Sequence, residues 1–221
     1  MKPTRFTFFV DSADRFEAER WLRTGVATGL TTNPTILKRA GLHLRHIPEI
    51  AEWARNAGAK EVCFQTWGST SAEWYNNALR LLELVPGATI KVPCTEAGAE
   101  VVTRLQEQGT SILLTAGYSP KQAMLASALG VRYFAPYFNR MRQSERDALA
   151  DLKAMADLIP QVAGAPQVMA ASIKSASDVT ALAHVGIRTF TLAPPVLEEL
   201  MQDRLTERDV LAFEDDMQAA R

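Results

Sequence analysis

The sequence has 221 residues, 47% of them hydrophobic, so it is long enough to bury one sizeable core. Its 24 Lys and Arg residues nearly balance its 25 Asp and Glu residues, which leaves no long-range positive field to hold a nucleic acid. Its apolar runs reach about five or six residues, far below the roughly 20 of a membrane span. Since no secretory signal is visible near the N-terminus either, we expect a cytoplasmic protein that binds neither nucleic acid nor membranes.

Short β-branched and aromatic runs alternate with longer segments of helical period along the chain. The predicted strands are residues 6–10, 27–31, 61–65, 88–92, 111–114, 133–135, 168–171 and 189–192. The predicted helices are residues 13–23, 44–56, 71–84, 95–106, 120–128, 145–158 and 177–184. This alternation of strand and helix predicts an α/β protein, and its spacing favours a closed (β/α)8 or TIM barrel over an open sheet.

The chain shows no internal repeat or linker, so we expect a single barrel domain over residues 1–221. After the last predicted strand, the sequence predicts a short helix to Met201 and a final amphipathic helix over residues 206–220. Phe213 and Met217 lie four residues apart and share one face of this extra helix. We therefore expect the C-terminal helix to pack on the barrel or on a neighbouring subunit.

Residue patterns for metals and nucleotides are lacking. Cys63 and Cys94 belong to no zinc-binding spacing, and we expect both to be reduced thiols in the core. His43 and His46 precede a predicted helix, away from any strand end, so they make a poor zinc site. Since no glycine-rich dinucleotide motif or Walker motif is present either, we expect neither a metal nor an organic cofactor.

Polar residues stand where a barrel enzyme would carry its chemistry. The active sites of (β/α)8 barrels lie on the loops after the carboxyl ends of the strands. Polar residues at or near these predicted ends are Asp11, Thr31, Asn33, Gln65, Lys91, Thr115, Tyr137, Arg140 and Ser172. We expect these side chains to converge on one mouth of the barrel.

Lys91 is unusual because it interrupts the apolar run of a strand that should be buried on both faces. Desolvation favours the uncharged amine of a buried lysine, which can attack a ketone and form a Schiff base. The alternative is a structural lysine, either paired with a carboxylate such as that of Asp11 or turned outward by the strand register. The periodicity of the sequence favours neither interpretation.

Other strand-end residues also have two interpretations. Asp11 could move a proton beside an imine or cap the next helix, and Asn33 lies before a proline that is typical of a helix start. Arg140 could bind a phosphate or carboxylate group or remain an exposed surface residue. Ser172, which opens the segment that ends at Lys174, could contact an anion or be an ordinary turn residue.

Several blocks of sequence together resemble a known family. They are VDSA (10–13), GLTTNP (29–34), IKVP (90–93), APYFNR (135–140), AASIK (170–174) and TL (191–192). In order and spacing they are similar to the small transaldolase family, whose short members include fructose-6-phosphate aldolase. The resemblance covers nearly the whole chain. It implies an enzyme that acts on a sugar or sugar phosphate and on a ketone donor fragment such as dihydroxyacetone, assembled as a pentamer or decamer.

The resemblance also implies roles for individual residues. Lys91 would be the Schiff-base lysine of a class I mechanism, which needs no metal. Asp11 would handle the proton of the hydroxyl next to the breaking carbon–carbon bond. Asn33 and Ser172 would hold hydroxyl groups of the ketose fragment, and Arg140 would bind the phosphate. Thr31 and Lys174 complete the predicted substrate-binding residues.

Two positions separate the activities within the family that the chain resembles. Transaldolases typically have glutamate and phenylalanine where this chain has Gln65 and Tyr137, and the fructose-6-phosphate aldolase group has glutamine and tyrosine. With Thr115, these residues could hold a water that protonates the enamine and releases a free ketone. We therefore expect a class I aldolase.

Two alternatives remain open. The first is a transaldolase that transfers the same three-carbon unit between sugar phosphates, as in the pentose phosphate pathway. The second is a non-catalytic sugar-phosphate binding barrel, suggested by residues 141–146, which are charged and helix-prone where the relatives have a Gly- and Asp-containing loop. There we expect Arg142 to pair with Glu145 on a helix surface. The rim formed by Pro194 and Pro195 also departs from the family pattern.

Overall fold

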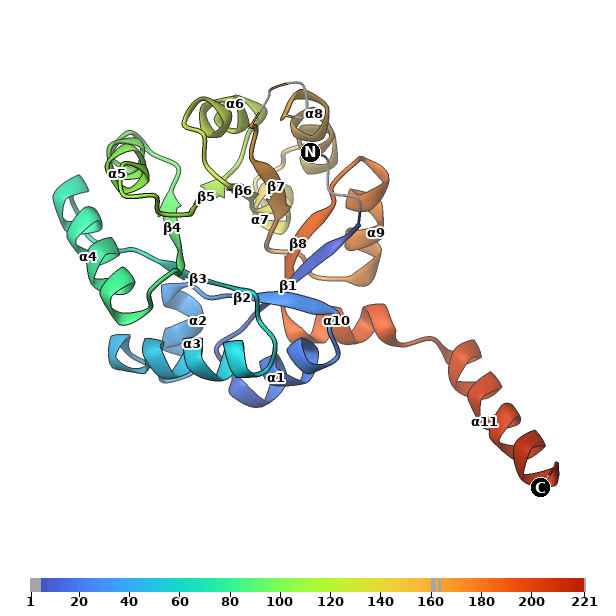
Figure 1. The fold of residues 1–221 in the computed structure, drawn as a ribbon. Coiled ribbons are helices and arrows are strands. Elements are labelled where there is room, and N and C mark those ends of the chain that lie inside the picture. Colours follow the sequence, from blue (N-terminus) through green and yellow to red (C-terminus); the bar gives the residue numbers. More distant parts are fainter. Residues whose placement is uncertain (1–4, 160–161, 163, 221) are drawn as a thin grey trace.

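The computed structural model describes residues 5–159, 162 and 164–220, so both ends of the predicted 1–221 domain lie outside the described residues. In this part of the chain, eight parallel strands close into a barrel in sequence order, which confirms the predicted (β/α)8 fold (Figure 1). The strands are β1 (Thr7–Asp11), β2 (Ala27–Thr31), β3 (Glu61–Gln65), β4 (Thr89–Pro93), β5 (Ile112–Gly117), β6 (Tyr133–Pro136), β7 (Gln167–Ala170) and β8 (Thr189–Leu192).

Helices follow the strands and surround the barrel (Figure 1). They are α1 (Arg15–Arg23), α2 (Pro34–Arg39), α3 (Ile47–Asn56), α4 (Ser71–Leu84), α5 (Glu96–Gln106), α6 (Pro120–Ala128), α7 (Phe138–Gln143), α8 (Ala148–Leu158), α9 (Ala176–His184), α10 (Pro194–Met201) and α11 (Arg204–Ala219), with a 3-10 turn η1 (Leu44–His46). Hydroxyl side chains cap the starts of several helices, as when Thr70 accepts a hydrogen bond from the Glu73 amide at the start of α4. None of the described helices is long and apolar enough to cross a membrane.

The side chains of the barrel form two separate apolar clusters. Strand side chains alternate between the barrel interior and the helices, and large residues such as Phe64, Phe134 and Phe190 join the cluster that includes the helices. The second, smaller cluster consists of Phe9, Cys63, Leu113, Tyr133, Ala135, Met169 and Ala171. This small cluster separates the amino-terminal end of the strands from the carboxyl end, where the candidate site residues lie.

Both cysteines are unpaired thiols, as predicted. Burial raises the pKa of the Cys63 thiol, and the Glu61 carboxylate raises it further, whereas the Lys91 ammonium lowers it. Burial also raises the pKa of Cys94. Because thiolate is the reactive form, raised pKa values make both cysteines poor nucleophiles at neutral pH.

A polar network closes the amino-terminal end of the barrel. The Glu61 carboxylate accepts hydrogen bonds from the hydroxyls of Thr89 and of Tyr133, the latter at 2.8 Å, and lies 3.5 Å from the Arg132 guanidinium. Thr89 and Tyr133 are both buried. Burial raises the pKa of the Tyr133 phenol, and the nearby Glu61 carboxylate raises it further. Glu61 is therefore the shared acceptor for buried hydroxyl groups from two other strands.

Replacing this shared acceptor should destabilise the barrel. Glu61→Leu removes the partner of the Tyr133 phenol, and we expect the free energy of unfolding to fall by about 1–3 kcal/mol, the cost of an unsatisfied buried polar group. Thr89 keeps a second contact, 3.0 Å from the Ser111 hydroxyl, and limits the loss. Urea denaturation measures the change. Glu61→Gln is the matched control because its amide oxygen still accepts, and equal losses in both variants would contradict this explanation.

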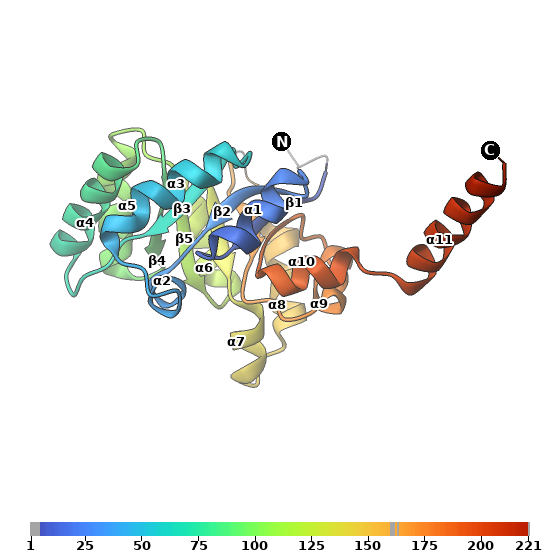
Figure 2. The same ribbon diagram turned by 90° about the horizontal axis from the view of Figure 1, so that it is seen from below.

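The C-terminal helix α11 leaves the barrel, and both views show it projecting away from the rest of the chain (Figures 1 and 2). It spans Arg204–Ala219 rather than the predicted residues 206–220, and every described residue in it is exposed. The two residues before it, Gln202 and Asp203, have extended backbones that carry the chain outward. The predicted packing of this helix on its own barrel is therefore wrong, and packing on a neighbouring subunit stays a prediction.

The segment after β6 also differs from expectation. The predicted helix over residues 145–158 begins only at Ala148, because Glu145 has a φ of 59°, a left-handed conformation that ends α7. The predicted ion pair between Arg142 and Glu145 is absent among the described residues, and Arg142 lies 2.9 Å from the Asp178 carboxylate at the start of α9. The left-handed residue breaks the helical spacing on which the expected pair depended.

Candidate active site

The carboxyl ends of the eight strands gather most of the predicted site residues at one mouth of the barrel. Asp11, Thr31 and Gln65 end β1, β2 and β3, while Lys91 and Thr115 lie within β4 and β5. Tyr137, Ser172 and Arg140 follow β6 and β7. Helix α7, which carries Arg140, lies beyond this end of the strands (Figure 2). Since all strands are parallel, their carboxyl ends share one edge of the barrel.

Lys91 is enclosed in the barrel, with 4% of its surface exposed. Its Nζ donates a hydrogen bond to the Thr32 carbonyl oxygen at 2.6 Å. Within the described part of the chain, Lys91 forms no ion pair with Asp11 or any other carboxylate. The burial of Lys91 and its bond to the Thr32 carbonyl show that the side chain is not turned outward. The contacts therefore match neither form of the structural alternative for Lys91.

Asp11 contacts the neighbouring strand β2 instead of capping a helix. Its Oδ1 accepts a hydrogen bond from the Thr31 hydroxyl at 2.6 Å. The cap of α1 is Asp14, which accepts from the Glu17 amide, while the Ser12 hydroxyl accepts from the Asp14 amide. The predicted alternative of Asp11 as a helix cap is therefore wrong. Its carboxylate is held at the mouth of the barrel by a buried hydroxyl.

Thr115 and Tyr137 form a hydroxyl pair on the opposite side of the barrel from Asp11. Their oxygens lie 2.8 Å apart, and the Tyr137 ring contacts Tyr118 edge to face with centroids 5.9 Å apart. Among the described residues, Gln65 has no hydrogen-bond partner for its amide. Gln65 pairs in register with Lys91 on the adjacent strand, which places the amide beside the lysine. The structure thus brings Thr115 and Tyr137 into direct contact and leaves Gln65 free.

Helix α7, which carries Arg140, is hydrogen-bonded through its backbone to the loop that contains Ser172. The amide of Asn139 in α7 donates to the Ser172 carbonyl at 3.0 Å, and the Phe138 amide donates to the Ala171 carbonyl at 2.9 Å. Ser172 itself has a φ of 59°, a strained conformation for a residue with a side chain. The exposed Arg140 guanidinium lies 4.8 Å above the Tyr137 ring. These contacts fix α7 and its arginine against the loop after β7.

Asn33 and Lys174 stand at the rim of the mouth. The Asn33 side-chain oxygen accepts from the Ile36 amide at 3.0 Å and caps α2, as the proline after it predicted. The Asn33 amide nitrogen has no acceptor within the described residues, so it can still donate to a bound hydroxyl. Lys174 is exposed two residues after Ser172. The rim therefore offers free donors and a second cation.

Sequence reasoning missed two residues of this site. Thr191 in β8 lies 2.6 Å from the Thr31 hydroxyl and 4% of it is exposed. Tyr118, directly after β5, supports the Tyr137 ring. Thr191 belongs to one of the sequence blocks, but a threonine in a strand resembles any β-former, so it was not predicted as a site residue. A tyrosine directly after a strand end, such as Tyr118, could have been noticed.

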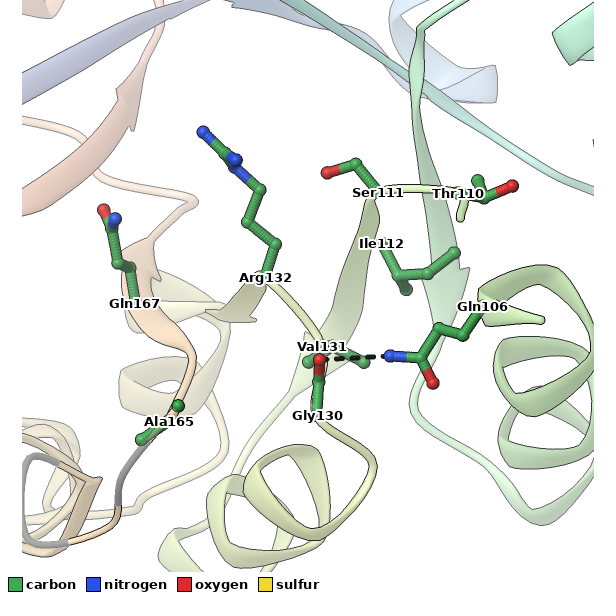
Figure 3. Close-up of a pocket in the computed structure, with 10 residues that line it drawn as sticks. Gln106, Thr110, Ser111, Ile112, Gly130, Val131, Arg132, Ala165 and Gln167 are labelled. Atoms are coloured by element: carbon green, nitrogen blue, oxygen red, sulfur yellow. Dashed lines mark hydrogen bonds between the residues drawn. The ribbon is translucent and has the colours of Figure 1, made fainter. Parts of the chain in front are cut away.

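A cavity of about 450 Å³ lies at the opposite, amino-terminal end of the strands (Figure 3). Its polar side chains include Arg132, Gln167 and Ser111. Each of the three already contacts a residue of the barrel interior: Glu61, Thr189 and Thr89, respectively. This cavity therefore belongs to the polar network that closes the end of the barrel, away from Lys91.

His43 and His46 contact each other in the segment between α2 and α3. His46 Nδ1 accepts from the His43 amide at 2.8 Å, and the two rings stack at the start of η1. No group of three His, Cys, Asp or Glu side chains that could hold a metal ion is found in the described residues.

Comparison with known proteins identifies the family. The sequence profile of the family described as transaldolase/fructose-6-phosphate aldolase matches residues 8–221. A probable transaldolase of Rhodospirillum centenum is 31% identical over 216 residues, covering 96% of this chain and 90% of the relative. One of Exiguobacterium sibiricum is 28% identical, covering 97% and 99%. The chain therefore belongs to the transaldolase/fructose-6-phosphate aldolase family of enzymes, as the sequence blocks indicated.

Solved structures agree on the fold. A thiamine phosphate pyrophosphorylase from Pyrococcus furiosus superposes with a TM-score of 0.65, covering 88% of this chain and 93% of that protein. Because the sequence identity is only 13%, this similarity supports the barrel fold and says nothing about the function.

Proposed function

We propose that this protein is a class I aldolase that reversibly cleaves a ketose or ketose phosphate into dihydroxyacetone or a similar ketone and an aldehyde such as glyceraldehyde 3-phosphate. The observation that carries the proposal is the enclosed Lys91 amine, which has no carboxylate partner among the described residues and shares the barrel mouth with Asp11. Membership of the family supports the same chemistry.

The cleavage proceeds through an imine. Lys91 Nζ attacks the ketone carbon of the substrate, water leaves, and a protonated imine forms. The Asp11 carboxylate then accepts the proton of the hydroxyl on the carbon beyond the breaking bond. As this hydroxyl becomes a carbonyl, the carbon–carbon bond breaks and its electron pair moves to the imine nitrogen. The aldehyde departs and an enamine remains on Lys91.

Release of the ketone requires protonation of the enamine. A water held by Gln65 and by the Thr115–Tyr137 pair gives a proton to the enamine carbon and takes one back from the protonated Asp11, which restores both the imine and the Asp11 carboxylate. Attack of water on the imine carbon then frees the ketone and regenerates the Lys91 amine. These residues are uncharged hydrogen-bonding groups that match the aldolase type in the family pattern.

The rim residues fit a phosphorylated substrate. Arg140 and Lys174 supply positive charge, and a guanidinium can bind a phosphate group through two parallel hydrogen bonds. The stacking of Arg140 on Tyr137 limits the freedom of its side chain before a ligand arrives. Asn33 and Ser172 hold hydroxyl groups of the ketone fragment, with Thr31 positioned beside Asp11.

The second candidate function is transaldolase activity, favoured by the names of the relatives, which are described as probable transaldolases. The same imine and enamine form on Lys91, but the enamine attacks a second aldehyde instead of taking a proton from water. The two functions differ only in the fate of the enamine.

Product analysis distinguishes the two functions. Fructose 6-phosphate is incubated with the protein without an acceptor aldehyde, and free dihydroxyacetone is measured. An aldolase accumulates free dihydroxyacetone over many turnovers. A transaldolase instead releases at most one equivalent of glyceraldehyde 3-phosphate per site, and it keeps the three-carbon unit on Lys91 until added erythrose 4-phosphate takes that unit up as a seven-carbon ketose phosphate. Formation of product only after that addition would contradict the aldolase proposal. No turnover under either condition would favour a non-catalytic sugar-phosphate binding barrel.

Removing the Tyr137 hydroxyl should shift the enamine from protonation to transfer. Tyr137→Phe leaves the ring but removes one of the groups that hold the water, so we expect release of free ketone to fall about 10- to 100-fold. Transfer to an added aldehyde should fall much less. Tyr75→Phe is the matched control, because that hydroxyl contacts Gln108 on the outside of the barrel. Equal loss of both activities in Tyr137→Phe would contradict this role.

We propose further that α11 packs on a neighbouring copy in a pentamer or decamer. Its exposed apolar side chains have no partner within the described chain, although burying such groups is favourable. They are Leu205, Val210, Leu211, Phe213 and Met217.

Ending the chain at Gln202 should therefore reduce the size of the assembly. We expect light scattering to show a multiple of the chain mass for the full-length protein and a smaller particle for the truncated one. The barrel itself should keep its helical and strand content by circular dichroism, since no residue of α11 packs on it. A monomeric full-length protein would contradict the proposal.

A further inference from the structure

The hydrogen bond between Asp11 and Thr31 continues to a third side chain. Thr191 Oγ1 in β8 lies 2.6 Å from Thr31 Oγ1, which in turn lies 2.6 Å from Asp11 Oδ1. Strand β1 lies between β2 and β8 in the closed barrel (Figure 1), and Thr31 pairs in register with Asp11 whereas Thr191 pairs with Phe9, two residues earlier in β1. We propose that Thr191 is a positioning residue that holds the Thr31 hydroxyl against Asp11 for proton transfer. This inference rests on the proposed role of Asp11.

The number of hydroxyl protons sets the direction of the hydrogen bonds that link Thr191, Thr31 and Asp11. An ionised carboxylate only accepts hydrogen bonds, so the single hydroxyl proton of Thr31 must point to Asp11. Thr31 can then only accept from Thr191. The result is a chain in which Thr191 donates to Thr31 and Thr31 donates to Asp11. Because donation polarises the next bond, the first hydroxyl strengthens the hydrogen bond to the carboxylate.

Burial keeps water from substituting for the hydroxyls in this series of hydrogen bonds. Thr31 is fully buried and Thr191 nearly so, which keeps solvent from replacing either hydroxyl. Thr191 therefore acts on the carboxylate through Thr31, and its removal should slow the cleavage step without weakening substrate binding.

Thr189 provides a matched comparison on the same strand. It lies two residues before Thr191, is equally buried, and donates to the Gln167 side chain at 3.1 Å at the amino-terminal end of the barrel. A general loosening of β8 would follow from losing either hydroxyl. A specific effect on Asp11 would follow from losing Thr191 alone.

The test measures ketose cleavage in Thr191→Ala, Thr191→Ser and Thr189→Ala. We expect Thr191→Ala to lower kcat about 3- to 10-fold, the rate equivalent of one neutral hydrogen bond, with KM changed less than about twofold. Thr191→Ser restores the hydroxyl and should recover most of kcat, and Thr189→Ala should keep it. In an Asp11→Asn background, Thr191→Ala should have no further effect. Unchanged kcat in Thr191→Ala, no recovery in Thr191→Ser, or an equal loss in Thr189→Ala would overturn the inference.

A crystal structure of Thr191→Ala tests the positioning without relying on turnover. With a partner on one side only, the Thr31 side chain should occupy a second rotamer, and its Oγ1 should leave hydrogen-bond distance of Asp11 Oδ1. An unchanged contact would overturn the inference even for an inactive protein. Failure of the proposed function is a separate outcome, since it would appear as a wild-type protein that cleaves no ketose.

Discussion

Replacing Lys91 with methionine should lower ketose cleavage by roughly 10⁴-fold or more, because the covalent route through the imine disappears entirely. Methionine has nearly the same length and suits a side chain that is 4% exposed, so the barrel should still fold. The lost hydrogen bond to the Thr32 carbonyl should cost only about 1 kcal/mol of stability. A steady-state cleavage assay measures the rate, and thermal unfolding checks the fold.

The matched control for this variant is Lys60→Met. Lys60 is an exposed lysine directly before β3, so its removal should leave cleavage unchanged. More than about one hundredth of the wild-type rate in a folded Lys91→Met protein would show that the reaction does not need this amine.

Replacing Asp11 with asparagine should lower kcat by about 10²- to 10⁴-fold, the usual contribution of a positioned general base. The amide oxygen can still accept from the Thr31 hydroxyl, so the arrangement of the mouth should survive. What is lost is the ability to take the proton from the substrate hydroxyl. Because Lys91 is intact, the variant should still form an imine with a ketone, and this separates imine formation from bond cleavage.

Asp14→Asn is the control for the Asp11 variant, since Asp14 caps α1 and an asparagine cap is equivalent. It should keep the wild-type kcat. An Asp11→Asn protein with unchanged kcat would show that another group accepts the proton of the substrate hydroxyl. One that no longer forms an imine would place Asp11 in the formation of the Schiff base instead of the cleavage step.

Much of the barrel could be predicted from the sequence because its units are local. The strand bounds of β2, β3 and β8 and the helix bounds of α4 and α6 match the predicted ranges, since apolar runs and Pro or Gly boundaries specify them directly. The direction of α11 could not be predicted. Its amphipathic pattern indicates only that another surface covers its apolar face. The extended backbone at Gln202 and Asp203 carries the helix away from its own barrel, so this surface is not the barrel of the same chain.

The same distinction holds at the candidate site. Lys91 was detectable because a charge inside an apolar strand is unusual in any sequence. Thr189 and Thr191 look alike in a strand of four residues, and only the closure of the barrel places one beside Gln167 and the other beside Thr31. Hydrogen bonds between residues 160 positions apart depend on this closure, which a local pattern does not encode.

Trapping the imine tests the central claim most directly. The protein is incubated with dihydroxyacetone or fructose 6-phosphate, reduced with borohydride, and analysed by mass spectrometry, with Lys91→Met treated in parallel. The account predicts one ketone adduct per chain, mapped to Lys91 by peptide analysis and missing from the variant. No adduct with either ketone, or an adduct that maps to another lysine, would contradict it.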